Sequence, residues 1–353
     1  MTAPEKRRAS GLDRLFRTTR IIIPIGVLGN IAFTLLTTDR SILSAMASFP
    51  RTYLALAVLL AFTPWLTNSL RLLIWGRFLG LPLRLRDAFQ MTLAVDLGSA
   101  ISPTAVGGNF FKWGMLVQRG MSAGAAASLT TFPLVEDGFF FAVALPIAII
   151  YTASWDLPVF QNLAHRVEGN ALQVIMVAAA IGLLTWLAVR MVLIGGLGHR
   201  TKSRGIYILA RLRRRTRSTW RDARDVYRII ILNGKARFAL SFTLTAIQWG
   251  ARYSVISALA AFLGAPVQPV LFWMLQWVVF TLMTFIPTPG AAGGAEAAFY
   301  FIYSAFLPSG VIGLATAGWR FLTFYLQLGI ASVIFFFLPL PRAAPPKVGA
   351  AAR

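Results

Sequence analysis

Hydrophobic residues gather along this chain into long runs that are separated by short polar or basic stretches. A helix needs about 20 consecutive apolar residues to cross the hydrocarbon core of a bilayer. Six runs approach or exceed this length, at residues 21–36, 53–70, 125–151, 172–194, 237–263 and 311–338. The pattern therefore predicts an all-α polytopic membrane protein with six full transmembrane helices.

Two further apolar segments are interrupted near their middle. The segment at 88–117 contains Ser-Pro-Thr-Ala-Val-Gly-Gly-Asn at 102–109, and the segment at 270–306 contains Pro-Thr-Pro-Gly-Ala-Ala-Gly-Gly at 287–294. Proline removes a backbone donor and glycine loosens a helix, so each segment is predicted to break there. Because a broken backbone inside a membrane must be satisfied by protein or by a water-filled cavity, we interpret each segment as a re-entrant hairpin.

Basic residues set the predicted orientation, because Lys and Arg are retained on the cytoplasmic side of membrane proteins. They concentrate before residue 21, in a predicted loop that contains Arg71, Arg77, Arg84 and Arg86, and at 195–237, which holds 13 of them. The prediction is a basic cytoplasmic N-terminus at 1–20, a single transmembrane domain at 21–340 and a cytoplasmic tail at 341–353. The two hairpins then begin on opposite sides of the membrane, as in the inverted repeats of many transporters.

Two alternatives to this topology are disfavoured. The first apolar run has features of a signal peptide, but the small residues at 45–47 lie too far beyond it for ordinary cleavage. Treating both interrupted segments as ordinary spans gives eight helices, but it places Lys112 and Arg119 outside and conflicts with the charge distribution. We therefore expect an uncleaved, multi-pass protein of the bacterial cytoplasmic membrane.

Composition narrows the functional classes. Hydrophobic residues make up 57% of the chain and charged residues only 13%, which excludes a soluble enzyme. The net charge of +22 comes with no groove-reading motif, so anionic lipid headgroups at the 195–237 loop, and not nucleic acid, are the expected partners. The chain has no cysteine, and His165 and His199 fall in predicted loops on opposite sides, so neither a metal site nor a cofactor is expected.

Several charged residues fall within predicted membrane segments, where each costs about 2.5–3.5 kcal/mol at the bilayer centre. They are Asp96, Lys112, Glu136, Asp137, Arg252, Glu296 and Arg320. Two interpretations are open: internal ion pairs that hold helices together, or a functional cavity, which the two glycine-rich breaks favour. Tryptophans near span ends, among them Trp65, Trp75 and Trp319, are interpreted as anchors at the membrane interface.

The second half of each hairpin is predicted to begin near Gly108 and Ala291, with its positive dipole end toward the middle of the membrane. Such an end suits a phosphate, and Arg252 and Arg320 are expected to add charge-assisted bonds. Glu296 is expected to hold Arg320, to contact a cationic or hydroxyl-bearing headgroup, or to carry a proton. The candidate substrate-binding residues are Pro103, Gly107, Gly108, Asn109, Lys112, Glu136, Asp137, Arg252, Pro289, Gly290, Gly294, Glu296, Arg320 and Tyr325.

The stretch Pro-Thr-Pro-Gly-Ala-Ala-Gly-Gly-Ala-Glu at 287–296, followed by Trp-Arg-Phe-Leu-Thr-Phe-Tyr at 319–325, resembles the C-terminal signature of the lysylphosphatidylglycerol synthase transmembrane, or flippase-like, family. The stretch at 102–109, with Lys112 and Gly-Met-Ser at 120–122, is similar to its N-terminal signature. The resemblance covers residues 15–340. The chain departs from the family pattern at Asn109, where an acidic residue is frequent, and around Pro133, Glu136 and Asp137, where an Arg-x-x-Asp pair is frequent.

The resemblance implies transbilayer movement of a lipid or lipid-linked molecule, and the residues indicate a phosphate headgroup. The family's synthase activity uses a fused soluble domain and is not expected of this chain, which ends shortly after its last predicted span. The alternative is a membrane transferase that uses Asp96, Glu136, Asp137 and Glu296 as general acids and bases. A third hypothesis is a non-catalytic accessory subunit of envelope lipid synthesis, and the oligomeric state stays open.

Overall fold

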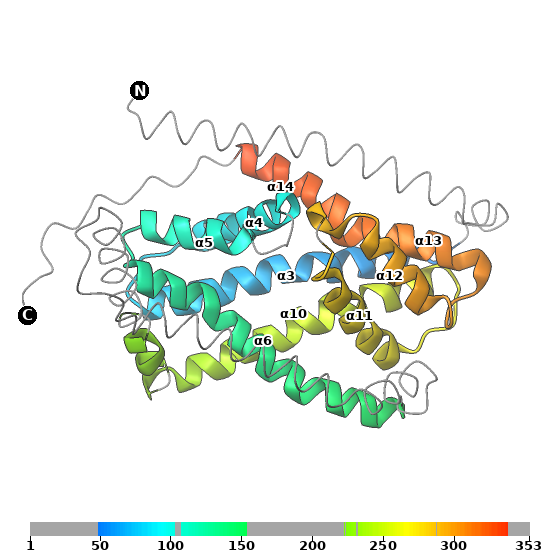
Figure 1. Cartoon of the computed structure of the whole chain (residues 1–353), viewed down its shortest axis with the longest axis horizontal. Coiled ribbons are helices and arrows are strands. Elements are labelled where there is room, and N and C mark those ends of the chain that lie inside the picture. The colour runs from blue at the N-terminus through cyan, green and yellow to red at the C-terminus, as the bar shows by residue number, and fades with distance from the viewer. Residues whose placement is uncertain are drawn as a thin grey trace, which may run out of the picture.

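The protein is all-helical in the part of the chain that the structure describes (Figure 1). A computed structural model gives this structure for residues 49–102, 107–153, 222, 224–230, 232–286 and 288–337. The elements in chain order are α3 (Arg51–Phe78), α4 (Leu85–Ile101), α5 (Gly107–Gln118), α6 (Ala123–Thr152), α10 (Lys235–Phe262), α11 (Pro269–Met283), the 3-10 helix η3 (Pro289–Ala291), α12 (Gly294–Tyr303), α13 (Ser309–Arg320), the π-helical turn η4 (Phe321–Tyr325) and α14 (Leu326–Phe337).

Three stretches of helix within the described residues are long and apolar enough to cross a membrane: α3, α6 and the continuous run Ser309–Phe335. They confirm that long apolar helices occupy the segments predicted at 53–70, 125–151 and 311–338. The predicted span at 237–263 is also one helix, α10, of 28 residues. The predicted spans at 21–36 and 172–194, the two terminal segments, most of the 195–237 loop and both histidines lie outside the described residues.

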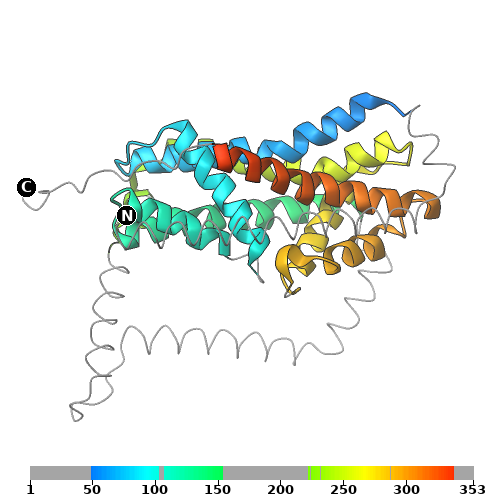
Figure 2. The same cartoon turned by 90° about the horizontal axis from the view of Figure 1, so that it is seen from above.

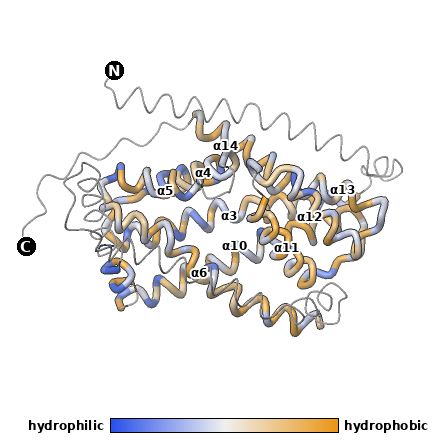
Figure 3. The backbone as a smooth tube through the Cα atoms, in the orientation of Figure 1, coloured by the Kyte–Doolittle hydropathy of each residue, from blue (hydrophilic) through white to orange (hydrophobic). Residues whose placement is uncertain are grey.

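Helices α3 and α10 form the centre of the bundle and pack on each other more extensively than any other pair of described elements. They run antiparallel, and α6 crosses beside them (Figures 1 and 2). Hydrophilic positions gather at the end of the bundle where α3 finishes and α10 begins (Figure 3). Arg77, Lys235 and Arg237 contribute to this end, so the basic residues that the sequence assigns to one side of the membrane lie together.

The two interrupted segments form helical hairpins, α4–α5 and α11–α12. In the first, Asp87 in the opening turn of α4 forms an ion pair of 2.9 Å with Arg119, which directly follows α5. In the second, the hydroxyl of Tyr303 at the end of α12 donates to the carbonyl oxygen of Phe272 near the start of α11, at 2.6 Å. Each hairpin therefore begins and ends at one level of the bundle.

Glycine lets the two arms of the first hairpin approach closely. A Cβ atom placed on Gly108 of α5 would lie 2.2 Å from the carbonyl oxygen of Val95 and 2.3 Å from the hydroxyl oxygen of Ser99, both on α4. Because protein interiors are close-packed, there is no room for these α4 atoms to yield. In the sequence, Gly108 marks only a helix break. In the structure it is also the point of close contact between α5 and α4.

The second break is longer than the first, since more residues separate α11 from α12 than separate α4 from α5. Gly290, Ala291 and Gly293 have φ angles of 61°, 55° and 80°, which belong to the left-handed region that glycine adopts without strain. As a result α12 begins at Gly294, and not near Ala291 as predicted. The turn of η3 within this break packs against α4, so the two hairpins meet inside the bundle.

The close contact at Gly108 generates a stability prediction. Replacing Gly108 with Ala should destabilise the protein by about 1–3 kcal/mol, because the new methyl group overlaps the α4 backbone. Thermal unfolding of the protein in detergent measures the effect. Gly114→Ala on the same helix is the matched control, since a Cβ there has nothing within 4 Å and should leave the melting temperature unchanged or raised. Equal melting temperatures for the two variants would contradict the packing described here.

Candidate functional site

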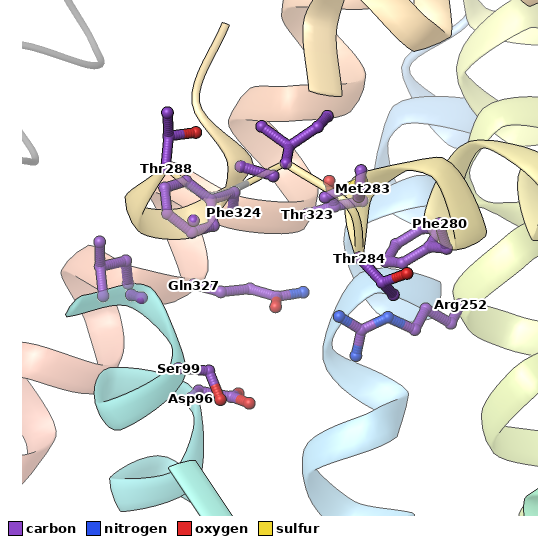
Figure 4. Close-up of a pocket in the computed structure, with 15 residues that line it drawn as sticks. Asp96, Ser99, Arg252, Phe280, Met283, Thr284, Thr288, Thr323, Phe324 and Gln327 are labelled. Atoms are coloured by element: carbon purple, nitrogen blue, oxygen red, sulfur yellow. The ribbon is translucent and has the colours of Figure 1, made fainter. Parts of the chain in front are cut away.

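A cavity of about 260 Å³ lies where α4 meets the second break (Figure 4). Four parts of the bundle contribute to its wall: α4, α10, the end of α11 with the break that follows it, and the helix that runs through η4 into α14. The lining residues are Asp96, Ser99, Ala100, Arg252, Phe280, Met283, Thr284, Ile286, Thr288, Gly290, Ala291, Thr323, Phe324, Gln327 and Leu328. Most are apolar or neutral, and Asp96 and Arg252 are the two charged members of this set.

Arg252 reaches the cavity from α10 without a neutralising partner. Its Nε atom is buried and has no hydrogen-bond partner, and no carboxylate of the described residues lies within 4.0 Å of its guanidinium. The guanidinium lies over the ring of Phe280, 5.1 Å from the ring centroid. This cation–π contact orients the side chain but leaves its charge uncompensated. The cavity therefore offers a cation with free donors.

Asp96 lies on the α4 wall of the cavity, apart from Arg252 (Figure 4). The indole N–H of Trp65 on α3 donates to its Oδ2 atom at 2.6 Å. Phe62 and Phe89 pack edge-on against the Trp65 ring, with centroid distances of 4.8 and 5.9 Å. The carboxylate is thus held in a fixed position beside the cavity.

A second charged group, centred on Arg320, holds the break of the α11–α12 hairpin. The Nε atom of Arg320 donates to Oε1 of Glu296 at 2.9 Å, and its Nη2 atom donates to the carbonyl oxygen of Gly290. The hydroxyl of Tyr325 donates to the same Glu296 oxygen at 3.4 Å. Since Arg320 directly precedes the π-helical turn η4 and Tyr325 is its last residue, this turn brings both side chains to Glu296.

A third charged group joins α3, α6 and α10, and it is built around Arg71. The prediction placed Arg71 in a basic loop, which is wrong: the residue lies inside α3 and is almost fully buried. Its guanidinium donates to Glu136 at 2.8 Å, to Asp137 at 3.1 Å and to the side-chain carbonyl of Gln248 at 3.0 Å. The second Glu136 oxygen accepts from the indole of Trp75 at 3.3 Å. The network satisfies a buried cation with two carboxylates.

The three arginines therefore differ in how their charge is balanced. Arg71 has two carboxylate partners and Arg320 has one, together with a backbone carbonyl. Arg252 has none in the part of the chain that the structure covers. A charge left unpaired inside a membrane is usually functional, because its burial is otherwise costly. Of the three, Arg252 is the one suited to bind an external anion.

The predicted site residues separate into groups in the structure. Arg252 and Gly290 line the cavity, and Pro289, Gly294, Glu296, Arg320 and Tyr325 belong to the adjacent break and its support. Glu136 and Asp137 are with Arg71. Gly107, Gly108, Asn109 and Lys112 lie on α5, where Lys112 is half-buried and forms no ion pair within 4.0 Å with a described residue. Pro103 lies outside the described residues.

The helix ends that were expected to bind an anion already hold internal partners. The N–H of Gly107 at the start of α5 donates to the hydroxyl of Ser102 at 3.1 Å. The N–H of Gly293, just before α12, donates to Oε2 of Glu296 at 2.9 Å. One donor at each end is thus occupied, and Arg320 is engaged with Glu296. Among the residues that line the cavity, Arg252 is the cation without a carboxylate partner in the described part of the chain.

Sequence reasoning missed Arg71 and the polar lining residues Thr323 and Gln327. Arg71 follows an apolar run and precedes other arginines, so a charge count assigns it to the loop. Trp65 and Trp75 are buried, and each donates a hydrogen bond to a carboxylate, so they are not the interface anchors that were predicted. Both tryptophans lie on α3, the helix that also carries Arg71. Within the described residues there is no group of three or more His, Cys, Asp or Glu residues that would hold a metal ion.

The Arg71 network generates a second stability prediction. Arg71→Gln should destabilise the protein by about 3–5 kcal/mol, because it leaves the fully buried Glu136 without its cation. Arg51→Gln, an equal change of charge at an exposed position of α3, should change stability by less than about 0.5 kcal/mol. Thermal unfolding in detergent compares the two variants. A melting temperature of Arg71→Gln that equals that of Arg51→Gln would show that the network does not stabilise the fold.

Comparison with known proteins agrees with the resemblance found in the sequence. Residues 21–331 match the family described as the lysylphosphatidylglycerol synthase TM region. The chain is also similar to a UPF0104 membrane protein of Archaeoglobus fulgidus, with 23% identity over 294 residues that cover 79% of this chain and 84% of the relative. The family match includes both hairpins, the cavity and all three arginine-centred groups. The protein therefore belongs to the lysylphosphatidylglycerol synthase transmembrane-region family.

Proposed function

We propose that the protein moves a lipid or lipid-linked molecule with a phosphate headgroup from one leaflet of the cell membrane to the other. The single observation that carries the proposal is the unpaired guanidinium of Arg252 in the cavity between the hairpins. A phosphate placed there accepts charge-assisted hydrogen bonds from a planar fork that suits two of its oxygens. Membership of a membrane family linked to lipid synthesis agrees with this role.

The size of the cavity supports a headgroup as the bound part. Its volume of about 260 Å³ falls below the range of about 300–1,000 Å³ that encloses drug-sized molecules. The acyl or isoprenoid chains of a lipid therefore stay outside, against the apolar surface of the bundle. Transfer of the polar headgroup into hydrocarbon is the main free-energy barrier to movement of a lipid between leaflets. A protein that shields only the headgroup therefore lowers the largest part of this barrier.

The arrangement of the hairpins supports a route that opens to both sides. We infer that α4–α5 enters the membrane from the basic end of the bundle, which is the cytoplasmic end by the distribution of Lys and Arg. The α11–α12 hairpin starts from the opposite end, so the two form an inverted pair whose breaks meet near the middle. On this topology both termini are cytoplasmic and the membrane is the bacterial inner membrane.

The role of Arg252 is testable in vesicles that contain the purified protein and labelled phospholipids. Arg252→Gln should slow transbilayer movement by roughly ten- to a hundredfold, because losing a charged hydrogen-bond donor costs about 1.5–3 kcal/mol. Arg51→Gln is the control, because it makes the same change of charge at an exposed position, and this variant should move lipid at the wild-type rate. Equal rates for Arg252→Gln and wild-type vesicles would remove the main support for the proposal.

Lipid analysis of a gene-deletion strain distinguishes transport from a membrane transferase. A transferase predicts that deleting the gene removes one modified lipid from total extracts, and that the purified protein converts a labelled lipid into a new species. Transport predicts an unchanged set of lipids with an altered distribution between leaflets. Mass spectrometry of extracts, combined with a membrane-impermeant headgroup reagent, separates these outcomes.

A further inference from the structure

We propose that the cavity selects a zwitterionic headgroup, in which a phosphate diester binds at Arg252 and an ammonium group binds at Asp96. The inference rests on the proposed function and names the substrate class of the same site. It begins from the observation that the two charged residues lining the cavity have opposite sign but lie on different walls (Figure 4). They form no ion pair with each other, since their charged atoms lie more than 4.0 Å apart.

The two charges of the cavity wall sum to zero, but they lie on opposite walls and do not pair directly. Arg252 and Asp96 attract each other across the space, and each is anchored on its own wall. Phe280 lies against the guanidinium at 5.1 Å, and Trp65 donates to the carboxylate at 2.6 Å. A ligand that fills the space and carries one negative and one positive group satisfies both residues at once, without adding net charge to the membrane interior.

Asp96 has one carboxylate oxygen that is free to accept a further hydrogen bond. Its Oδ2 atom accepts the bond from Trp65, whereas its Oδ1 atom has no hydrogen-bond partner among the described residues. The aromatic packing around Trp65 keeps this geometry fixed. A carboxylate held in this way presents its free oxygen to the cavity, where an ammonium N–H forms a charge-assisted bond.

The neutral residues of the wall act mainly as acceptors. The hydroxyls of Thr284, Thr288 and Thr323 each donate to a nearby backbone carbonyl, so their oxygens are left to accept. The amide nitrogen of Gln327 donates to a backbone carbonyl of α3, which leaves its side-chain oxygen available. Apart from Arg252, the side-chain donors that remain are the Ser99 hydroxyl and the second amide hydrogen of Gln327. Side-chain acceptors therefore outnumber side-chain donors on the wall, which favours a ligand that brings its own donors.

Charge distinguishes an ammonium group from a hydroxyl group at Asp96. A polyol headgroup supplies donors but no positive charge, so its phosphate would neutralise Arg252 and leave the Asp96 carboxylate unpaired in a low-dielectric site. An ammonium group neutralises Asp96 and supplies donors together. The geometry therefore favours a phosphoethanolamine-type headgroup over a phosphoglycerol headgroup.

The test compares labelled phosphatidylethanolamine with labelled phosphatidylglycerol in vesicles that contain the full-length protein. Wild-type protein should move phosphatidylethanolamine about tenfold faster, which corresponds to about 1.4 kcal/mol. Asp96→Asn should lower the phosphatidylethanolamine rate about tenfold and change the phosphatidylglycerol rate little, whereas Arg252→Gln should lower both. Asp225→Asn, an equal change at an exposed position, is the control and should keep the wild-type preference. A preference for phosphatidylglycerol, or one that Asp96→Asn leaves unchanged, overturns the inference while the proposed function stands.

Movement of neither lipid by a correctly folded wild-type protein counts instead against the proposed function. A binding measurement then tests the headgroup preference separately. Soluble glycerophosphoethanolamine should raise the melting temperature of the wild-type protein in detergent more than glycerophosphoglycerol does, because a ligand that binds only the folded state stabilises it. Asp96→Asn should remove this difference. The side-chain oxygen of the substituted residue still accepts the bond from Trp65, so the unliganded variant should melt near the wild-type temperature, and equal shifts by both compounds in the wild-type protein overturn the inference.

Discussion

The neutralisation of charge away from water governs the interior of this protein. Three arginines lie within a bundle that exposes many large hydrophobic side chains, and the charge of each is balanced differently. Arg71 is surrounded by acceptors from two other helices, and Arg320 is bound to Glu296 and to the backbone of the second break. These two are satisfied internally, whereas Arg252 has no carboxylate partner among the described residues.

The position of the Arg71 network explains why the bundle keeps its shape around the cavity. It joins α3, α6 and α10, and α3 with α10 forms the most extensive helix contact. Arg320 performs the corresponding role at the second hairpin, where its bond to the carbonyl of Gly290 satisfies a backbone group exposed by the break. A broken helix inside a membrane persists only when such groups are satisfied. The ion pairs and the breaks are thus parts of one arrangement.

The arms of the two hairpins are joined in different ways, and this difference sets the position of the cavity. The first hairpin closes tightly through Gly108, whose hydrogen replaces a side chain that would overlap α4. The second has a longer break, in which the positive φ angles of Gly290, Ala291 and Gly293 turn the chain before α12. The longer break leaves space next to α4, and Asp96 and Ser99 face that space. A tight hairpin beside an open one therefore produces a polar cavity within an apolar bundle.

The length of the apolar runs and the Pro-Gly interruptions determined the helical class, the spans at α3, α6 and α13–α14, and both hairpins, because bilayer thickness and backbone chemistry act locally along the chain. Seven charges within the predicted membrane segments were also visible in the sequence, and Arg252 was among the candidate site residues, whereas the buried Arg71 was assigned to a loop. What the sequence did not determine is which charges pair: Arg71 and Gln248 are 177 positions apart and meet only because α3 crosses α10. The tertiary structure alone decided that Glu136 and Asp137 neutralise Arg71, that Glu296 neutralises Arg320, and that Arg252 faces Asp96 across a cavity. Electrostatic partners depend on distance in space, and the crossing of helices sets that distance.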